Sequence, residues 1–595
     1  MKFFLNFYYY MRRIEKKAVF NQPLKLSLLS VALLVLFFLE GFSQPFQPFQ
    51  YKIAIIGNPS NPDIRYDSST LSSLKKHGFN ALQLNIAWGA RPADEPLNLE
   101  DIFYTGEKED TSGINRRFAA IKNRARIAKK WGFRTIFHFG APSVDSLYKL
   151  LSPEKIDVAT ATHSIQKKEI ADKYRNLLMR LRRSIPEIDD ILVYTFDQEA
   201  WIGSEFGNDT LARGIPLHER LPAFLNMLTK TWATINPEGR LWWEPWELSA
   251  GQIYACIDSL PGSNFGVAMH ANIAEVQFTR PVDIWFKNMC NLLTEKNIPV
   301  IGEIFMSGAN EEVEPLQHIF APRLVFEELE AMYGVRKLTG IKEYYGTIPD
   351  AYDPNLQMAG LKLNIPDLDV KHALDHLAIP YGASKNLVLQ AWEATAKGLQ
   401  LFPWDCSWRF RLLPVGMTGI QVFHRWDIGH ISGAVAPSPS WKSTRRGLFM
   451  ITEEEKLDPW FFEDIELRSA AAADQLLLAI AAYEKLNEAL PENTVQKRSI
   501  PATILDLQKL EQIMRAIQCY CREVTLANMM RENVQKNIPV PQDLIGRFNA
   551  IMKIDIRNQQ KGLVENKDKV TTAEEMLGAF NANPAEWVIQ HLIIQ

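Results

Sequence analysis

Acidic side chains recur at the ends of short apolar segments in the first half of the chain. The most distinctive case is Phe196-Asp197-Gln198-Glu199, where two carboxylates stand two residues apart. Residues i and i+2 of a strand share a face, so Asp197 and Glu199 can point into one cleft. Carboxylates crowded into one cleft raise one another's pKa, so one can stay protonated while another is ionised. Cleavage of a glycosidic bond needs a pair of this kind.

Two further carboxylates follow later apolar segments. Glu303 stands in Val300-Ile301-Gly302-Glu303, and Glu343 precedes Tyr344. We predict that Glu199 is the general acid and that Asp197 orients either the substrate or Glu199. Glu303 is the first choice for the second carboxylate, as nucleophile or base, and Glu343 is the next choice.

Polar and aromatic residues near the same segment ends are candidates for substrate binding. Flat indole rings can stack on sugar faces, although packing between domains explains the tryptophans equally well. The predicted binding residues are Asn85, Trp88, His138, Trp201, Glu244, His270, Tyr344, Trp404 and Trp408. His138 and His270 lack the regular spacing of metal ligands, so we predict neither a metal nor a cofactor. A metal-dependent hydrolase would require one of these histidines to converge with carboxylates.

The spacing of these residues implies a repeating supersecondary unit that positions them. Short apolar, β-branched segments alternate with amphipathic helical stretches such as residues 115–132 and 218–235. The predicted strands cover residues 51–57, 80–88, 134–140, 190–199, 240–248, 264–272, 298–306 and 338–346. Eight such units predict an α/β fold, a (β/α)8 barrel over residues 45–365. A doubly wound open sheet is the alternative, but no glycine-rich phosphate loop follows the first strand.

The remainder of the chain has a different pattern. We predict a mostly α-helical C-terminal domain over residues 366–595, with an aromatic-rich segment at residues 400–460. The five cysteines are too scattered for a disulfide framework or a paired metal motif.

The N-terminus and the composition suggest an exported protein. A basic stretch and a 14-residue apolar segment precede small residues at 41 and 43, which predicts a signal peptide over residues 1–43. We expect a periplasmic or secreted protein without stable membrane insertion after cleavage. The 66 basic and 69 acidic residues give a net charge of −3, which argues against nucleic acid as a partner.

The arrangement of acidic residues resembles TIM-barrel glycoside hydrolases. Asp197-Gln198-Glu199 resembles the Asp-x-Glu end of the fourth strand in family 18 chitinases and the Asp-Glu pair of family 20 hexosaminidases. This resemblance implies that the glutamate is the acid and the aspartate steers a 2-acetamido group. Glu199 and Glu303 also resemble the acid/base after the fourth strand and the nucleophile after the seventh in many retaining glycosidases. The residues 214–220 and 236–237 are similar to a loop and helix of α-glucuronidase-like enzymes.

Together these features predict an exported glycoside hydrolase that cleaves glycosidic bonds of oligo- or polysaccharides, with carbohydrate as its partner. The alternative is a non-catalytic glycan-binding protein on the same barrel, because a fold does not determine a function.

Overall fold

The computed structural model describes most of the chain. Residues 48–595 form one compact unit. The described residues are 48–58, 64–86, 94–106, 111–140, 164–194, 205, 210–245, 250–270, 284–308, 316–346, 352–403, 418–419, 459–560 and 567–591. The predicted signal peptide lies outside them. No helix among the described residues is long and apolar enough to cross a membrane.

Eight parallel strands form a closed barrel in the order β1 to β8, so the predicted (β/α)8 fold is confirmed. The strands are β1 (Tyr51–Ile55), β2 (Ala81–Gln83), β3 (Arg134–Gly140), β4 (Asp190–Tyr194), β5 (Leu241–Glu244), β6 (Phe265–His270), β7 (Val300–Ile304) and β8 (Gly340–Glu343). The barrel closes where β1 pairs with β8, with Tyr51 opposite Gly340. This closure excludes the doubly wound open sheet.

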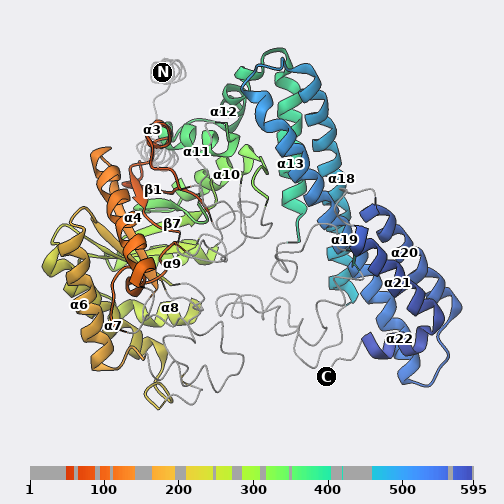
Figure 1. Ribbon diagram of the computed structural model, residues 1–595, viewed down its shortest axis with the longest axis horizontal. Helices are drawn as coiled ribbons and strands as arrows, with labels where there is room; N and C mark the ends of the chain where they lie inside the picture. The colour runs from red at the N-terminus through yellow and green to blue at the C-terminus, as the bar shows by residue number, and fades with distance from the viewer. Residues whose placement is uncertain are drawn as a thin grey trace, which may run out of the picture. The chain divides into compact units, whose positions relative to one another are not determined.

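Helices connect successive strands and cover the outside of the barrel; Figure 1 shows α4, α6 and α7 in this position. The barrel helices are α3 (Ser68–Lys76), α4 (Thr111–Lys130), α6 (Lys168–Ser184), α7 (Leu217–Ile235), α8 (Ala250–Cys256), α9 (Ile284–Glu295), α10 (Pro322–Tyr333) and α11 (Pro354–Asn364). Short 3-10 turns are η1 (Leu99–Asp101) and η3 (Ile257–Ser259). Asp67 caps the start of α3 by accepting a hydrogen bond from the Thr70 amide at 2.8 Å. The capping side chain satisfies a donor that the helix itself leaves unpaired.

Large side chains fill the barrel interior near the amino ends of the strands. The rings of Tyr51 and Trp242 meet edge to face, with their centroids 5.1 Å apart. A Cβ at Gly266, which pairs with Trp242 in the next strand, would lie 2.3 Å from the Trp242 ring. Only glycine leaves room for the indole there, so the sequence places its largest side chain beside its smallest.

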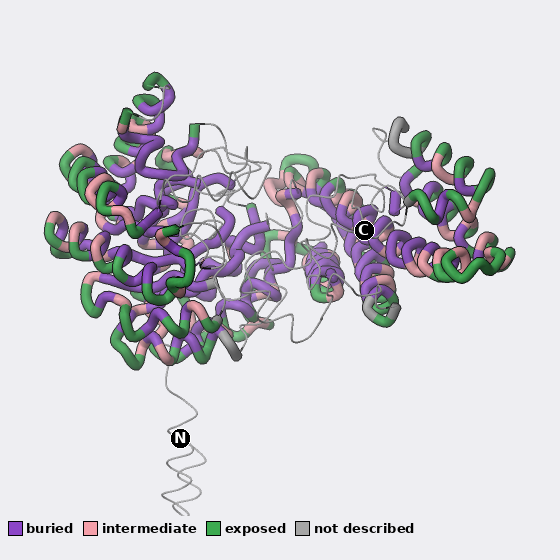
Figure 2. The backbone as a smooth tube through the Cα atoms, turned by 90° about the horizontal axis from the view of Figure 1, so that it is seen from below, coloured by how far each residue is buried: buried purple, intermediate pink, exposed green. Residues whose placement is uncertain are grey.

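The C-terminal residues are helical, as predicted. The elements are α12 (Val370–Leu377), η5 (Ile379–Ser384), α13 (Lys385–Leu401), α18 (Pro459–Ala489), η7 (Gln496–Ser499), α19 (Ile500–Gln535), α20 (Gln542–Gln560), α21 (Lys567–Ala582) and α22 (Pro584–His591). Helices α13, α18 and α19 pack side by side (Figure 1). Figure 2 shows that the barrel strands are buried along their length, whereas the helices alternate between buried and exposed residues. The domain boundaries near residue 366 stay a prediction.

Candidate active site

Four charged or titratable side chains meet inside the barrel. Lys342 Nζ lies 2.9 Å from Glu303 Oε1 and 3.8 Å from Glu244 Oε2. His138 Nε2 lies 3.3 Å from the same Glu244 oxygen. Glu244 is on β5, whereas Lys342 is on β8 and His138 on β3, so the two contacts of Glu244 cross the interior. Glu303 and Lys342 lie opposite each other on the neighbouring strands β7 and β8. We call these four residues the barrel cluster.

The barrel cluster lies at the carboxyl ends of the barrel strands. Glu244 is the last residue of β5, and Glu303 is one residue from the end of β7. Active sites of (β/α)8 enzymes are formed at the carboxyl ends of the strands. The sequence placed Glu244, Glu303 and His138 at such ends, and the structure brings all three together.

The ion pairs of the barrel cluster are fully buried. The side chains of His138, Glu244, Glu303 and Lys342 each have an exposed fraction of 0%. A buried charge is costly unless it is paired, so each carboxylate depends on a partner of opposite charge. An ion pair with Lys342 exists only when Glu303 is ionised, which is the state that a nucleophile or general base requires.

Asn85 fixes the backbone of His138 rather than projecting toward the barrel cluster. Its Nδ2 donates to the carbonyls of His138 and Pro96, both at 2.9 Å, and its Oδ1 accepts from the His138 amide at 3.1 Å. The side chain therefore extends the pairing between the ends of β2 and β3. On the next strand, β4, the ring of Tyr194 lies beside that of His138, with their centroids 5.2 Å apart.

The structure does not bring Glu343 to the barrel cluster. Its carboxylate accepts hydrogen bonds from the amides of Met306 at 2.7 Å, Tyr345 at 3.3 Å and Gly346 at 3.4 Å. Lys342 and Glu343 are adjacent on β8, so their side chains point to opposite faces. Burial raises the pKa of Glu343 to about 7, while the three amides act in the opposite direction. Glu343 holds together the chain segments that follow β7 and β8.

The raised pKa of Glu343 predicts a pH-dependent stability. A carboxyl with a folded pKa of about 7 and an ordinary pKa of 4.5 contributes stability fully below pH 4.5. This contribution is lost as the pH rises through 7. We expect the free energy of unfolding of Glu343→Gln to fall less between pH 5 and pH 8 than that of the parent, by about 2–3 kcal/mol. Urea titrations at both pH values measure this difference.

The control for this prediction is Glu488→Gln, which changes an exposed carboxylate on α18. It should leave the difference between the two pH values unchanged. Equal pH dependence in Glu343→Gln and the parent would show that Glu343 does not titrate in this range.

The other predicted site residues have different positions. Tyr344 is buried, and its ring packs edge to face on Phe305 with centroids 5.2 Å apart. His270 ends β6, where the strand register pairs it with Glu303. The predicted residues outside the described part of the chain are Trp88, Asp197, Glu199, Trp201, Trp404 and Trp408.

Sequence reasoning missed Lys342, the residue that joins the two carboxylates. A lysine inside a short apolar strand is the available signal, because lysine is almost never fully buried unless it is paired. The Lys342 side chain has an exposed fraction of 0%. A buried lysine on the predicted eighth strand would have indicated an acidic partner across the barrel.

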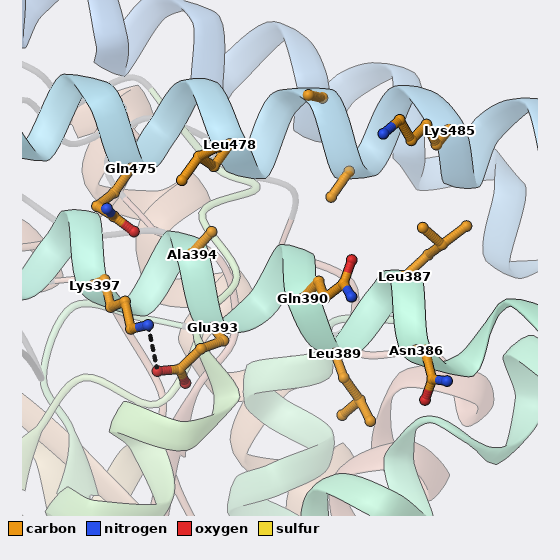
Figure 3. A pocket seen from close by; sticks show the side chains of 12 residues that line it. Asn386, Leu387, Leu389, Gln390, Glu393, Ala394, Lys397, Gln475, Leu478 and Lys485 are labelled. Carbon is orange, nitrogen blue, oxygen red and sulfur yellow. Dashed lines mark ion pairs between the residues drawn. The ribbon is translucent and has the colours of Figure 1, made fainter.

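A groove of about 630 Å³ lies on the helical part of the chain, between α13 and α18. Figure 3 shows its lining, in which Glu393 pairs with Lys397 at 3.7 Å. Glu393 also pairs with Arg323 at 2.8 Å. The groove has a single lining carboxylate, already engaged by two cations, so it offers no carboxylate pair. Across the described ranges, no group of three or more His, Cys, Asp or Glu side chains could hold a metal ion.

Comparisons with solved structures agree with the fold. The chain is similar to a GH138 enzyme targeting pectin rhamnogalacturonan II, with a TM-score of 0.56 and 12% sequence identity, over 90% of this chain and 68% of that chain. A GH18 chitinase from Pseudoalteromonas aurantia matches with a TM-score of 0.32 and 14% identity, over 53% of this chain and 99% of that chain. An endo-1,4-beta-mannanase from Rhizomucor miehei matches with a TM-score of 0.34 and 10% identity, over 54% and 95%.

No protein-family model and no curated protein matches the chain. The match to the GH138 enzyme supports a TIM-barrel fold of the kind that glycoside hydrolases use. This confirms the predicted resemblance to TIM-barrel glycoside hydrolases at the level of the fold, and the activity has to be argued from the site.

Proposed function

We propose that this protein is a glycoside hydrolase that cleaves glycosidic bonds of oligo- or polysaccharides with a pair of carboxylates. The observation that carries this proposal is the buried ion pair between Glu303 on β7 and Lys342 on β8. The pair holds an ionised carboxylate near the carboxyl end of a barrel strand, where enzymes of this architecture perform their chemistry. The fold shared with the GH138 enzyme supports the same class of reaction.

The reaction divides between two carboxyl groups. An oxygen of Glu303 forms a bond to the anomeric carbon while the glycosidic bond breaks, and the bonding pair stays on the leaving oxygen. Glu199 gives its proton to that oxygen. Water, deprotonated by Glu199, then attacks the anomeric carbon and releases Glu303 as a carboxylate. Asp197 orients Glu199 or the substrate.

Substrate contacts and export complete the proposal. We assign stacking on sugar rings to Trp88, Trp201, Trp404 and Trp408, since indole faces suit this contact. The basic and apolar pattern of residues 1–43 supports export to the periplasm or the medium.

The role of Glu199 predicts a dependence on the leaving group. Glu199→Gln keeps the shape of the side chain and loses the transferable proton. We expect turnover of substrates with poor leaving groups to fall about 10²- to 10⁴-fold, while activated aryl glycosides react nearly as before. A panel of aryl glycosides and acetamido sugars identifies the substrate, and initial rates with two leaving groups then measure the effect.

The matched control is Glu219→Gln, an exposed glutamate in the first turn of α7, the helix that follows β4. It should leave both rates unchanged. Equal losses of Glu199→Gln on both substrates would contradict a role as proton donor.

A further inference from the structure

The barrel cluster contains one ammonium between two carboxylates. Lys342 Nζ is 2.9 Å from Glu303 Oε1, a hydrogen-bonding distance, and 3.8 Å from Glu244 Oε2. Charge-assisted hydrogen bonds between nitrogen and carboxylate are about 2.7–2.9 Å long. The ammonium is therefore closer to Glu303 than to Glu244, and both carboxylates are within ion-pairing range.

The proposed reaction changes the charge of only one of these carboxylates. When Glu303 forms its bond to the anomeric carbon it becomes an ester, and its negative charge is lost. Lys342 has an exposed fraction of 0%, so its ammonium depends on the charged groups around it. A buried ammonium that loses its counter-charge is strongly destabilised, which would raise the energy of the covalent intermediate.

Glu244 is placed to take over this ammonium. The same oxygen, Oε2, lies 3.8 Å from Lys342 Nζ and 3.3 Å from His138 Nε2, so the carboxylate stands between two nitrogen groups. Two hydrogen bonds with the Asn85 side chain hold the backbone of His138, and Asn85 is itself anchored by a third bond to the Pro96 carbonyl. Glu244 thus has a fixed support on one side and Lys342 on the other.

We propose that Lys342 and Glu244 are positioning residues that compensate charge during the reaction. Lys342 holds Glu303 as a carboxylate in the free enzyme and transfers its ion pair to Glu244 when Glu303 becomes an ester. The inference rests on the proposed role of Glu303 as nucleophile. It assigns Glu244 to charge compensation, in place of direct contact with substrate.

The first test is a crystal structure of Glu303→Gln, which removes the charge of residue 303 as the ester does. A neutral amide is a weaker partner for an ammonium than a carboxylate is. We expect Lys342 Nζ to move to about 3 Å from a Glu244 oxygen. A structure in which Nζ stays on the Gln oxygen and no closer to Glu244 than 3.8 Å would overturn the inference. This test needs no substrate, so its outcome is independent of whether the protein hydrolyses the sugars offered.

The second test is kinetic and keeps the inference decidable where Glu303→Gln does not fold. With the 2,4-dinitrophenyl glycoside of the sugar selected by the panel, Glu244→Gln should lower kcat/KM about 10²-fold. The acid limb of its pH profile should move to lower pH, because an anion competing for Lys342 has been removed. A residue with only a structural role would not shift this limb.

The matched control is Glu100→Gln, which removes the charge of another buried glutamate paired with a lysine. Glu100 Oε1 lies 3.2 Å from Lys173 Nζ and accepts a hydrogen bond from Tyr174 at 2.9 Å. Its kcat/KM and acid limb should match the parent. Parent-like kinetics of Glu244→Gln alongside an inactive Glu303→Gln would refute charge compensation and leave the hydrolase intact. A parent enzyme that hydrolyses no glycoside would instead contradict the proposed function.

Discussion

Replacing Glu303 with alanine should abolish glycoside turnover in a protein that still folds. The proposed reaction has no other group to form the covalent bond, so we expect kcat to fall by about 10⁴-fold or more. The variant also removes the charge partner that lies 2.9 Å from Lys342. Rates with the activated aryl glycoside, together with circular dichroism of the purified variant, separate loss of chemistry from loss of fold.

Glu100→Ala is the control for Glu303→Ala. Both residues are buried and face a lysine, but Glu100 belongs to η1 and does not contact the barrel cluster. We expect Glu100→Ala to lose stability and to keep its kcat. Parent-like turnover in Glu303→Ala would remove Glu303 from the catalytic pair.

Replacing Arg134 with alanine should destabilise the barrel strongly. Arg134 donates two hydrogen bonds of 2.6 Å to Asp190, whose side chain has an exposed fraction of 0%. Asp190 also accepts from the Arg240 amide at 2.8 Å. Removal of one partner leaves a buried charge uncompensated, so we expect a loss of about 3–5 kcal/mol in the free energy of unfolding at pH 7.5.

Protonation of Asp190 should recover part of that loss. Burial raises the pKa of Asp190, and Arg134 opposes this effect, so the variant should raise the pKa further. We expect the destabilisation by Arg134→Ala to be smaller at pH 5 than at pH 7.5, as urea titrations at both pH values would show. The control is Arg116→Ala, which breaks an exposed ion pair with Asp94 and should cost about 1 kcal/mol or less. Similar losses of unfolding free energy in the two variants would show that the buried Arg134–Asp190 pair contributes no more than an exposed one.

The barrel could be predicted because each of its strands carries a local signal. Apolar, β-branched segments such as Val300–Ile304 alternate with helices such as α6, whose buried residues Ile170, Tyr174 and Leu177 follow the helical period. The predicted strands extended beyond the observed ones at their carboxyl ends, for example to residue 346 instead of Glu343. Polar residues that follow a strand satisfy no periodicity, so the sequence does not mark where pairing stops.

The barrel cluster could be predicted only in part, because it depends on which face of each strand points inward. Glu343 and Tyr344 are adjacent, so both could not point into the barrel, yet both were predicted to lie in the site. The strand register resolves the choice by pairing Lys342 with Glu303. Paired residues of neighbouring strands share a face, so Lys342 and not Glu343 joins the carboxylates. That register arises from closure of the whole barrel and cannot be read from one strand.

Chemical rescue of Glu303→Ala tests the central claim most directly. The alanine leaves space where a small anion can attack the anomeric carbon in place of the carboxylate. With the activated aryl glycoside and sodium azide, we expect turnover to return and the product to be a glycosyl azide whose anomeric configuration is inverted relative to the substrate, as nuclear magnetic resonance would show. If azide restores no turnover in Glu303→Ala but forms the inverted glycosyl azide with Glu244→Ala, the nucleophile is Glu244 and the proposed role of Glu303 is wrong.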